Sequence, residues 1–342
     1  MKIKLLIALL PVLAIIISAC KKEDNQVTPE TPIDTAAAKV YVAGYWGIRS
    51  CLWVDGVPTM LSEPGLYSEA YDVKVSGSDV YVCGFESKYA VYWKNGKRVR
   101  LSDGSSSSRC EKLFLADTNV YVIGYLEPDP NKDIPKLWVN GIDVPLNIPE
   151  DGRLTDVFVS GNNVYLTGWY RNSHDNLVPY LWKNGVVEDL TDGSVSTVAK
   201  ALYVNGSDVY IAGYEVDDYY NAKPFYWKNG IKSYLLDAGS DSQVSSIFSA
   251  GSDLYIGGYK RDSTNYMYVP VYWKNGGLFT MGHSDAFNSL YRSFFLYNND
   301  MYATGQGYLQ GKNNKATYSK NDNFIILADT TTSVTGEAIF VK

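Results

Sequence analysis

The sequence has few of the residues from which most catalytic and metal sites are built. Its 342 residues include only two histidines, His174 and His283, and four cysteines. Three of the cysteines stand 32 and 27 residues apart, whereas zinc ligands usually come in closely spaced pairs. There is no Gly-x-Ser-x-Gly motif, and no glycine-rich loop leads into a helical pattern that could bind a phosphate. These absences predict no catalytic residues, no metal site and no cofactor.

The few cysteines and the acidic net charge bear on two further properties, disulfide bonding and nucleic-acid binding. Cys51, Cys83 and Cys110 are expected to be small core residues, although a bridge between Cys83 and Cys110 or between Cys51 and Cys83 stays open in an oxidising compartment. The chain has 31 basic and 37 acidic residues and a formal net charge of −6. Because nucleic acid is itself strongly negative, a nucleic-acid partner is not expected.

The longest apolar run lies at the start of the chain. Residues 1–19 carry Lys2 and Lys4, then apolar residues from Leu5 to Ile17, then small residues before Cys20, which is the pattern of a secretory signal peptide. The run is shorter than the roughly twenty residues that cross a bilayer as a helix. The tetrapeptide Ile-Ser-Ala-Cys that ends at Cys20 resembles the lipobox of bacterial lipoproteins, which implies that Cys20 is lipidated.

A polar segment follows the cysteine. Lys22-Glu23-Asp24 resembles the charged export signal of surface lipoproteins in Bacteroidetes. The rest of residues 20–38 has no apolar periodicity and predicts a flexible tether. Removal of residues 1–19 would leave 29 basic and 37 acidic residues, a net charge of −8. We expect a protein of the cell envelope that touches the outer membrane through its lipid only, facing either the periplasm or the cell exterior.

The rest of the chain is dominated by two motifs in fixed phase. The first reads apolar, Tyr, apolar, small, Gly, aromatic, and its tyrosines stand at 41, 81, 121, 165, 210, 255 and 302, which are 40 to 47 residues apart. The second is Trp-Lys-Asn-Gly with variants, beginning at Trp53, Trp93, Trp138, Trp182, Trp227 and Trp273, with Tyr318 to Asp322 as a degenerate copy. A period of this length indicates a repeat architecture.

Each repeat divides into four short strands separated by turn residues. Asn-Gly and Asp-Gly between apolar runs favour tight hairpins. Seven such units predict an all-β fold, a seven-bladed β-propeller of four-stranded antiparallel blades. The repeated Trp and Tyr residues are expected to pack between blades, and the inner strands to be apolar almost continuously.

The two ends of the repeat region are complementary. The region enters at a second-strand motif near Lys39, and residues 336–341 match a first strand, so the C-terminal strand is expected to close the ring by pairing with the N-terminal blade. The expected domains are a signal peptide at 1–19, Cys20 and the tether at 20–38, and the propeller at 39–342. Its blades are expected at 39–62 plus 335–342, 69–101, 110–146, 154–190, 197–236, 243–281 and 289–327.

The Trp-Lys-Asn-Gly units resemble the short repeats of HAF-type extracellular bacterial proteins and of β-propeller lipoproteins common in Bacteroidetes. The resemblance covers residues 39–342. It implies an architecture and a place in the envelope, but no defined activity.

The copies differ in the length between their second and third strands. From the motif Gly to the motif Trp takes 9 residues in the first two units but 14 or 15 in the next four. Loops on a rigid scaffold often carry binding, so this long-loop face is the expected ligand site, with simple solvated loops as the alternative. Its candidate ligand-binding residues are Tyr170, His174, Asp217, Asp218, Tyr219, Tyr220, Asp262, Tyr266 and Tyr268.

These observations predict a monomeric, non-enzymatic binding module that holds a glycan or a protein ligand. Two alternatives remain. One is a structural or assembly subunit of an outer-membrane complex. The other is an enzyme that acts on polysaccharide, because the paired carboxylates of such enzymes have no fixed spacing in sequence.

Overall fold

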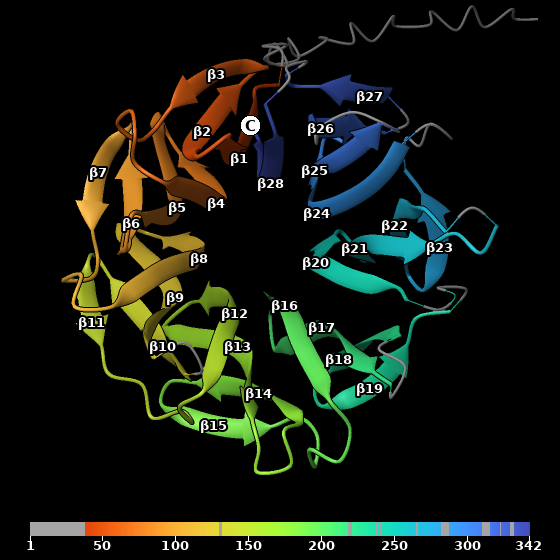
Figure 1. The fold of residues 1–342 in the computed structure, drawn as a ribbon. Coiled ribbons are helices and arrows are strands. Elements are labelled where there is room, and N and C mark those ends of the chain that lie inside the picture. Colours follow the sequence, from red (N-terminus) through yellow and green to blue (C-terminus); the bar gives the residue numbers. More distant parts are fainter. Residues whose placement is uncertain are drawn as a thin grey trace, which may run out of the picture. The chain divides into compact units, whose positions relative to one another are not determined.

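The computed structural model describes residues 38–342 except 130–131, 218–220, 237–238, 240, 265, 282–286, 310–314, 322 and 329–331. These residues form seven four-stranded antiparallel sheets that stand around one centre as a seven-bladed β-propeller (Figure 1). The expected signal peptide, Cys20 and nearly all of the tether lie outside the described residues. Within the described part of the chain, no helix is long and apolar enough to cross a membrane.

Each blade runs from an innermost to an outermost strand. The first blade consists of β28 (Val334–Val341), β1 (Val40–Trp46), β2 (Arg49–Val54) and β3 (Val57–Met60). The second has β4 (Ser68–Ser76), β5 (Asp79–Glu86), β6 (Tyr89–Lys94) and β7 (Lys97–Arg100). The third has β8 (Ser107–Ala116), β9 (Asn119–Asp129), β10 (Lys132–Val139) and β11 (Ile142–Val144). The fourth has β12 (Gly152–Ser160), β13 (Asn163–Arg171), β14 (Leu177–Lys183) and β15 (Val186–Asp189).

The last three blades follow the same order. The fifth has β16 (Thr197–Asn205), β17 (Asp208–Val216), β18 (Ala222–Lys228) and β19 (Ile231–Tyr234). The sixth has β20 (Gln243–Ala250), β21 (Asp253–Arg261), β22 (Tyr268–Lys274) and β23 (Gly277–Thr280). The seventh has β24 (Phe287–Tyr297), β25 (Asp300–Leu309), β26 (Lys315–Lys320) and β27 (Asn323–Ile326).

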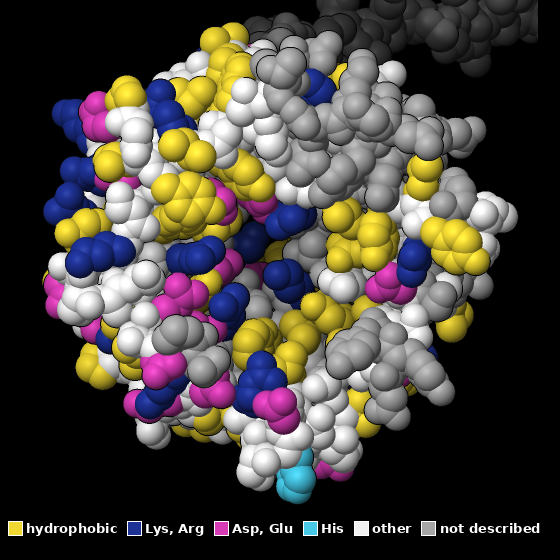
Figure 2. Space-filling model, viewed as in Figure 1, with side chains coloured by type: hydrophobic (Ala, Val, Ile, Leu, Met, Phe, Trp, Pro, Cys, Tyr) yellow, Lys and Arg dark blue, Asp and Glu magenta, His cyan; other side chains and the backbone are white. Residues whose placement is uncertain are grey.

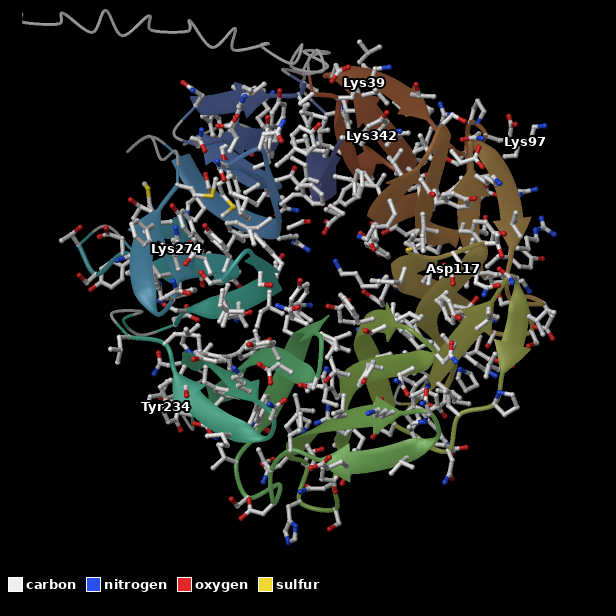
Figure 3. All side chains as sticks on the ribbon, turned by 180° about the vertical axis from the view of Figure 1, so that it is seen from behind. Lys39, Lys97, Asp117, Tyr234, Lys274 and Lys342 are labelled. Carbon is white, nitrogen blue, oxygen red and sulfur yellow. The ribbon has the colours of Figure 1, made fainter. Side chains whose placement is uncertain are left out.

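The ring closes as the sequence predicts. Strand β28 pairs antiparallel with β1, in a register that places Val341 opposite Val40. Lys39 and Lys342 extend this ladder by exchanging backbone hydrogen bonds of 2.8 and 3.0 Å, and they lie side by side in Figure 3. The innermost strand of the first blade therefore comes from the opposite end of the repeat region, which pairs two sheet edges that would otherwise be open.

The tryptophans of the second motif lie between the blades, as predicted. All six are at most 7% exposed. Trp93, for example, packs in one cluster with Val73 of its own blade and with Ala43 and Ala338 of the first blade. Truncation of a buried Trp to Ala typically costs about 3–5 kcal/mol, so these side chains hold neighbouring blades together.

The Lys-Asn-Gly part of the motif fastens two turns of the same blade. Asn95 has a positive φ of 51°, as a type I′ turn requires. Its side chain accepts a hydrogen bond from Val80 N at 2.8 Å and donates one to Asp79 at 2.8 Å. Lys94 pairs with Asp79 at 2.8 Å and lies 5.1 Å from the centre of the Tyr81 ring. The same contacts recur in the fifth, sixth and seventh blades, so this motif is structural.

The structure also shows whether the cysteines form disulfide bonds. Cys51, Cys83 and Cys110 are all free and buried, so neither of the two bridges that the sequence left open is formed. They are core residues of their blades.

Candidate functional site

The innermost strand of every blade carries one residue more than the strand beside it. In the second blade Ala70 pairs with Gly84 and Asp72 with Cys83, which leaves Tyr71 as the extra residue of a β-bulge. A bulge of this kind bends the strand and re-aims a side chain. The extra residues in the seven blades are Tyr71, Glu111, Thr155, Lys200, Ser245, Arg292 and Glu337.

The glycine of the first motif is what makes each bulge sterically possible. A Cβ atom at Gly84 would overlap the carbonyl oxygen of Glu69, and one at Gly124 would overlap that of Arg109. The corresponding glycines of the other five blades face the inner strand in the same way. None of these glycines needs a positive φ. The repeated glycine is therefore explained by the close approach of the bulged strand.

Six of the seven bulged residues, all but Thr155, line a cavity of about 370 Å³, to which all seven innermost strands contribute. This size lies in the usual range of small-molecule pockets, roughly 300–1,000 Å³. Figure 2 shows the hollow at the centre of the ring, with Lys and Arg side chains around it. We call it the charged pocket; its polar lining is Tyr71, Arg109, Glu111, Lys112, Tyr125, Arg153, Lys200, Gln243, Ser245, Tyr259, Tyr291, Arg292 and Glu337.

Only some of the charges in this pocket are paired within the protein. Arg292 Nη1 lies 3.1 Å from Glu337 Oε2. Arg153 donates to Asp133 at 2.6 Å and lies 4.3 Å from the centre of the Tyr125 ring. Lys200, by contrast, makes no hydrogen bond or ion pair with any residue that the structure describes.

Burial shifts the titration of several groups in the charged pocket. It raises the pKa of Glu337 to about 7, although Arg292 acts in the opposite direction. It also raises the pKa of Glu111 above its usual value, against the nearby Lys200 and Arg153. The Lys200 side chain is exposed to the cavity. Desolvation by the protein around the cavity nevertheless lowers its pKa, although the neighbouring Glu111 acts in the opposite direction. Both protonation states of these groups are thus accessible nearer to neutral pH than in free side chains.

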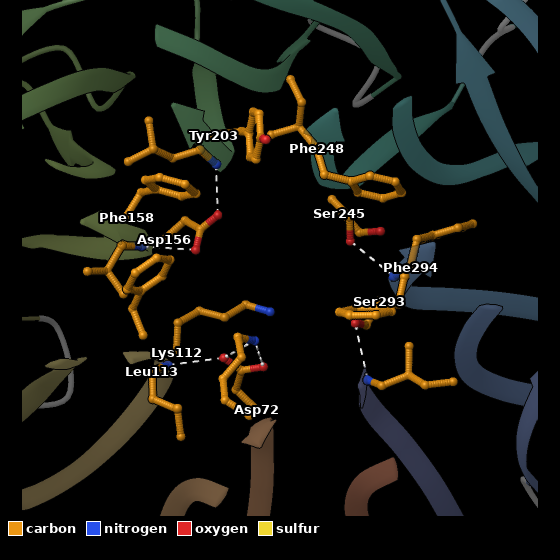
Figure 4. Close-up of a pocket in the computed structure, with 18 of the residues that line it drawn as sticks. Asp72, Lys112, Leu113, Asp156, Phe158, Tyr203, Ser245, Phe248, Ser293 and Phe294 are labelled. Atoms are coloured by element: carbon orange, nitrogen blue, oxygen red, sulfur yellow. Dashed lines mark hydrogen bonds and ion pairs between the residues drawn. The ribbon is translucent and has the colours of Figure 1, made fainter. Parts of the chain in front are cut away.

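A second cavity of about 350 Å³ adjoins the first, and Lys112 and Ser245 line both. We call it the aromatic pocket, because Phe114, Phe158, Tyr203, Phe248 and Phe295 line it. Its centre is shown in Figure 4, where Lys112 points into the open space between Asp72 and Asp156.

The polar groups of the aromatic pocket mostly link neighbouring blades. Asp72 accepts a hydrogen bond from Leu113 N at 3.1 Å, and Asp156 accepts one from Leu202 N at 2.8 Å. Burial would lower the pKa of Lys112, but the two carboxylates on either side raise it. These contacts have a structural role, which leaves the charged pocket as the stronger candidate for a ligand.

The residues predicted on the long-loop face do not gather around either pocket. The structure describes six of them, spread over the fourth, fifth and sixth blades, and none of the six lines the charged or the aromatic pocket. Asp218, Tyr219 and Tyr220 lie outside the described residues. Part of the extra length that motivated this prediction is strand, most clearly in the third blade, where β9 reaches Asp129 and β10 starts at Lys132.

Several of the predicted side chains have local partners. Tyr170 donates to Asp189 at 3.0 Å, and Tyr268 donates to Asp241 at 2.9 Å. Asp217 accepts from the backbone N–H of Asn221 at 2.8 Å, and Asp262 accepts from that of Thr264 at 2.7 Å; both are turn contacts.

Two predicted residues are exposed to solvent, and a third contacts the wall of the charged pocket. His174 is exposed, and Tyr266 is 67% exposed. Tyr268 packs edge-on against Tyr259, which lines the charged pocket, with ring centres 5.2 Å apart. That contact joins the predicted face to the central site.

The sequence analysis missed the charged pocket. Its expectation that the inner strands are apolar almost continuously is wrong at the bulge, where four of the seven extra residues are charged. A usable signal was present: Lys200, Arg292 and Glu337 each interrupt a mostly small or apolar first-strand segment, and Glu111 stands at the same place in its repeat.

Comparison with known proteins supports the fold. No family model and no curated protein matches the chain. An acylaminoacyl peptidase from Pyrococcus horikoshii matches with a TM-score of 0.54 and 12% identity, over 85% of this chain and 51% of that one. The β-propeller domain of the Trilobed protease from Pyrococcus furiosus matches with a TM-score of 0.54 and 11% identity, over 85% and 92%. A puromycin-hydrolyzing peptidase from Mycobacterium tuberculosis gives 0.51 and 10%, over 84% and 53%.

These similarities define the class of fold and nothing more. The chain spans about half the length of the two complete peptidases that it matches. At 10–12% identity they support the β-propeller fold without showing an activity. The propeller from P. furiosus is described as having an open velcro topology, whereas β28 closes the first blade here.

Proposed function

We propose that this chain is a ligand-binding β-propeller of the bacterial cell envelope, which holds its ligand in the charged pocket without catalysing a reaction. One observation carries the proposal: six of the seven bulges project a side chain into one cavity, and all six of these side chains are polar or charged. Polar groups that converge in a cavity, beside aromatic side chains such as Tyr125 and Tyr259, mark a candidate binding site.

The envelope location rests on the beginning of the sequence. The signal pattern of residues 1–19 and the lipobox-like Ile-Ser-Ala-Cys support a lipid on Cys20, with residues 21–38 as a tether. Lipid anchoring would hold the propeller at the outer membrane while its cavity stays open to solutes. Labelling cells with a radioactive fatty acid would test this, since a Cys20→Ser variant should lose the label.

The dimensions of the cavity favour a small ligand or the end of a glycan chain over a protein face. A pocket of about 370 Å³ at the centre of a ring admits a narrow molecule, whereas a stable protein interface buries roughly 800 Å² on each partner. The exposed His174 and Tyr266 remain candidate contacts for the parts of a longer glycan that extend beyond the cavity.

A variant that fills the cavity tests this proposal. Ser245 lines both central pockets, so Ser245→Trp should occupy their junction. We expect binding on a glycan array to be lost, while Lys97→Trp, on the edge strand of the second blade, leaves it unchanged. Equal binding by Ser245→Trp and the unmodified chain would move the ligand away from the centre and end the proposal.

One observation favours a hydrolytic alternative. Glu111 and Glu337 line the same pocket, and burial raises the pKa of both, which is how a carboxylic acid is kept protonated for proton donation. An enzyme of this kind should release reducing ends from a polysaccharide, and Glu111→Gln and Glu337→Gln should each abolish the release. Binding without turnover would exclude this alternative.

A further inference from the structure

The charged pocket has more positive than negative side chains. Arg109, Lys112, Arg153, Lys200 and Arg292 line it, whereas Glu111 and Glu337 are its two carboxylates. This excess stands out because the chain as a whole has a net charge of −6. The positive side chains come from four different blades, so the excess is not a local run of basic sequence.

Lys200 is a positive side chain of the charged pocket without a partner among the described residues. It is the extra residue of the bulge in β16 and points into the charged pocket. No residue that the structure describes gives it a hydrogen bond or an ion pair. Its side chain is exposed to the cavity, so an anion that enters the cavity can form a charge-assisted hydrogen bond with it.

The two carboxylates in the pocket leave the positive excess in place. Glu337 already pairs with Arg292 at 3.1 Å. Its pKa of about 7 means that it is partly protonated near neutral pH, which increases the net positive charge of the pocket. Glu111 lies among Lys200, Arg153 and Arg109. Because Arg153 already pairs with Asp133 at 2.6 Å, Glu111 can balance only one of the two remaining charges.

Tyrosine side chains form much of the remaining wall. Tyr71, Tyr125, Tyr259 and Tyr291 line the charged pocket. Aromatic faces with polar edges suit the flat faces and hydroxyl groups of a sugar ring. The pocket therefore combines a place for a negative group with a surface for a saccharide.

We infer that the charged pocket binds an acidic saccharide, whose carboxylate or phosphate group is held by Lys200 together with the arginines of the neighbouring blades. This inference rests on the proposed function, because it requires the ligand to occupy the central cavity. Carboxylate and phosphate share the chemistry that guanidinium and ammonium groups recognise.

The test is isothermal titration calorimetry of the purified full chain. The probes are glucuronate, glucose 6-phosphate and inorganic phosphate, with glucose as the neutral control. We expect glucuronate or glucose 6-phosphate to bind more tightly than glucose by about tenfold or more, and the affinity to fall as salt is added. Binding of inorganic phosphate alone would show that the anionic group needs no sugar, and would overturn the saccharide part of the inference.

Three variants complete the experiment. Lys200→Met should weaken the bound anion by about tenfold or more, whereas Lys200→Arg should retain it. Because Lys200 has no partner within the described protein, neither change should unfold the propeller, and circular dichroism can check this. Lys97→Met, on the outer strand β7 (Figure 3), is the matched control and should bind as the unmodified chain does.

The outcomes also separate this inference from the proposed function. Failure of all three anions to bind, or equal affinity of Lys200→Met and the unmodified chain, would overturn the inference. Binding of glucose that Ser245→Trp abolishes would overturn it too, but would leave a central binding site standing. Anion binding that Ser245→Trp leaves unchanged would contradict both.

Discussion

Glu337 Oε2 lies 3.1 Å from Arg292 Nη1, so an ion pair in the charged pocket joins β28, the strand that closes the ring, to β24 of the seventh blade. Glu337 is only 9% exposed, and burial outweighs the effect of Arg292, which sets its pKa at about 7 compared with an ordinary value of 4.5. The joint of the ring is therefore sensitive to pH near neutrality.

The first prediction concerns that sensitivity. A folded-state pKa above the unfolded value means that Glu337 contributes stability that is fully present below pH 4.5 and is lost as the pH rises through 7. The shift corresponds to about 3 kcal/mol. We expect Glu337→Gln to flatten the pH dependence of the unfolding free energy, measured by urea denaturation at pH 5 and pH 8. Glu188→Gln on the outer strand β15 is the control, and an unchanged slope in Glu337→Gln would contradict the prediction.

The second prediction concerns the glycines behind the bulges. Gly124→Ala would place a Cβ atom against the carbonyl oxygen of Arg109 in the neighbouring strand, so either the bulge or the sheet must shift. We expect a loss of about 2 kcal/mol or more, measured by thermal unfolding. Gly277→Ala is the control, because its nearest neighbour atom would be 3.4 Å away and its φ is not positive. Equal melting temperatures for the two variants would refute the steric explanation.

The third prediction concerns ring closure. Deletion of residues 335–342 removes most of β28 and exposes the edge of β1 and the inner faces of β24 and β4. We expect the truncated chain to lose its soluble monomeric form, measured by size-exclusion chromatography. Removal of Lys342 alone costs two backbone hydrogen bonds to Lys39 and should leave a monomer. Near-normal thermal unfolding of the longer deletion would argue against closure by β28.

The fourth prediction concerns the fastened turns. The side chain of Asn275 accepts a hydrogen bond from Leu254 N at 2.9 Å and donates one to Asp253 at 2.7 Å, and its φ is 50°. Asn275→Gly keeps this φ accessible and should cost about 1 kcal/mol through the lost hydrogen bonds. Asn275→Ala should cost more, because alanine resists a positive φ. Urea unfolding of both variants is the measurement, and the reverse order would contradict this reading of the motif.

The propeller was predictable from the sequence because the same two motifs recur in every blade. The tyrosines from Tyr41 to Tyr302 and the tryptophans from Trp53 to Trp273 recur in fixed phase, and each occupies one structural position. The match between residues 336–341 and a first strand was enough to predict the pairing of β28 with β1. Repetition turns weak local signals into a firm prediction.

The charged pocket was not predictable in the same way. Which side chain faces the centre depends on a bulge, and a one-residue insertion reverses the alternation of a strand without leaving a mark in composition. The residues that meet there, such as Glu111 and Arg292, are also far apart in the chain. Conversely, the length of the segments near Tyr170 and Tyr266 predicted a ligand site there. In the structure, part of that length extends the strands of the two hairpins.

The placement of β28 has a consequence for how the protein acquires its shape. The partner that β1 requires follows every other strand in the chain, so the first blade must wait, with one side uncovered, until all seven blades have been synthesised. A pause late in synthesis would leave a row of finished blades that cannot yet form a cavity. Assembly of the central chamber is thus the last event in folding, and a chain cut short before Val334 never builds one.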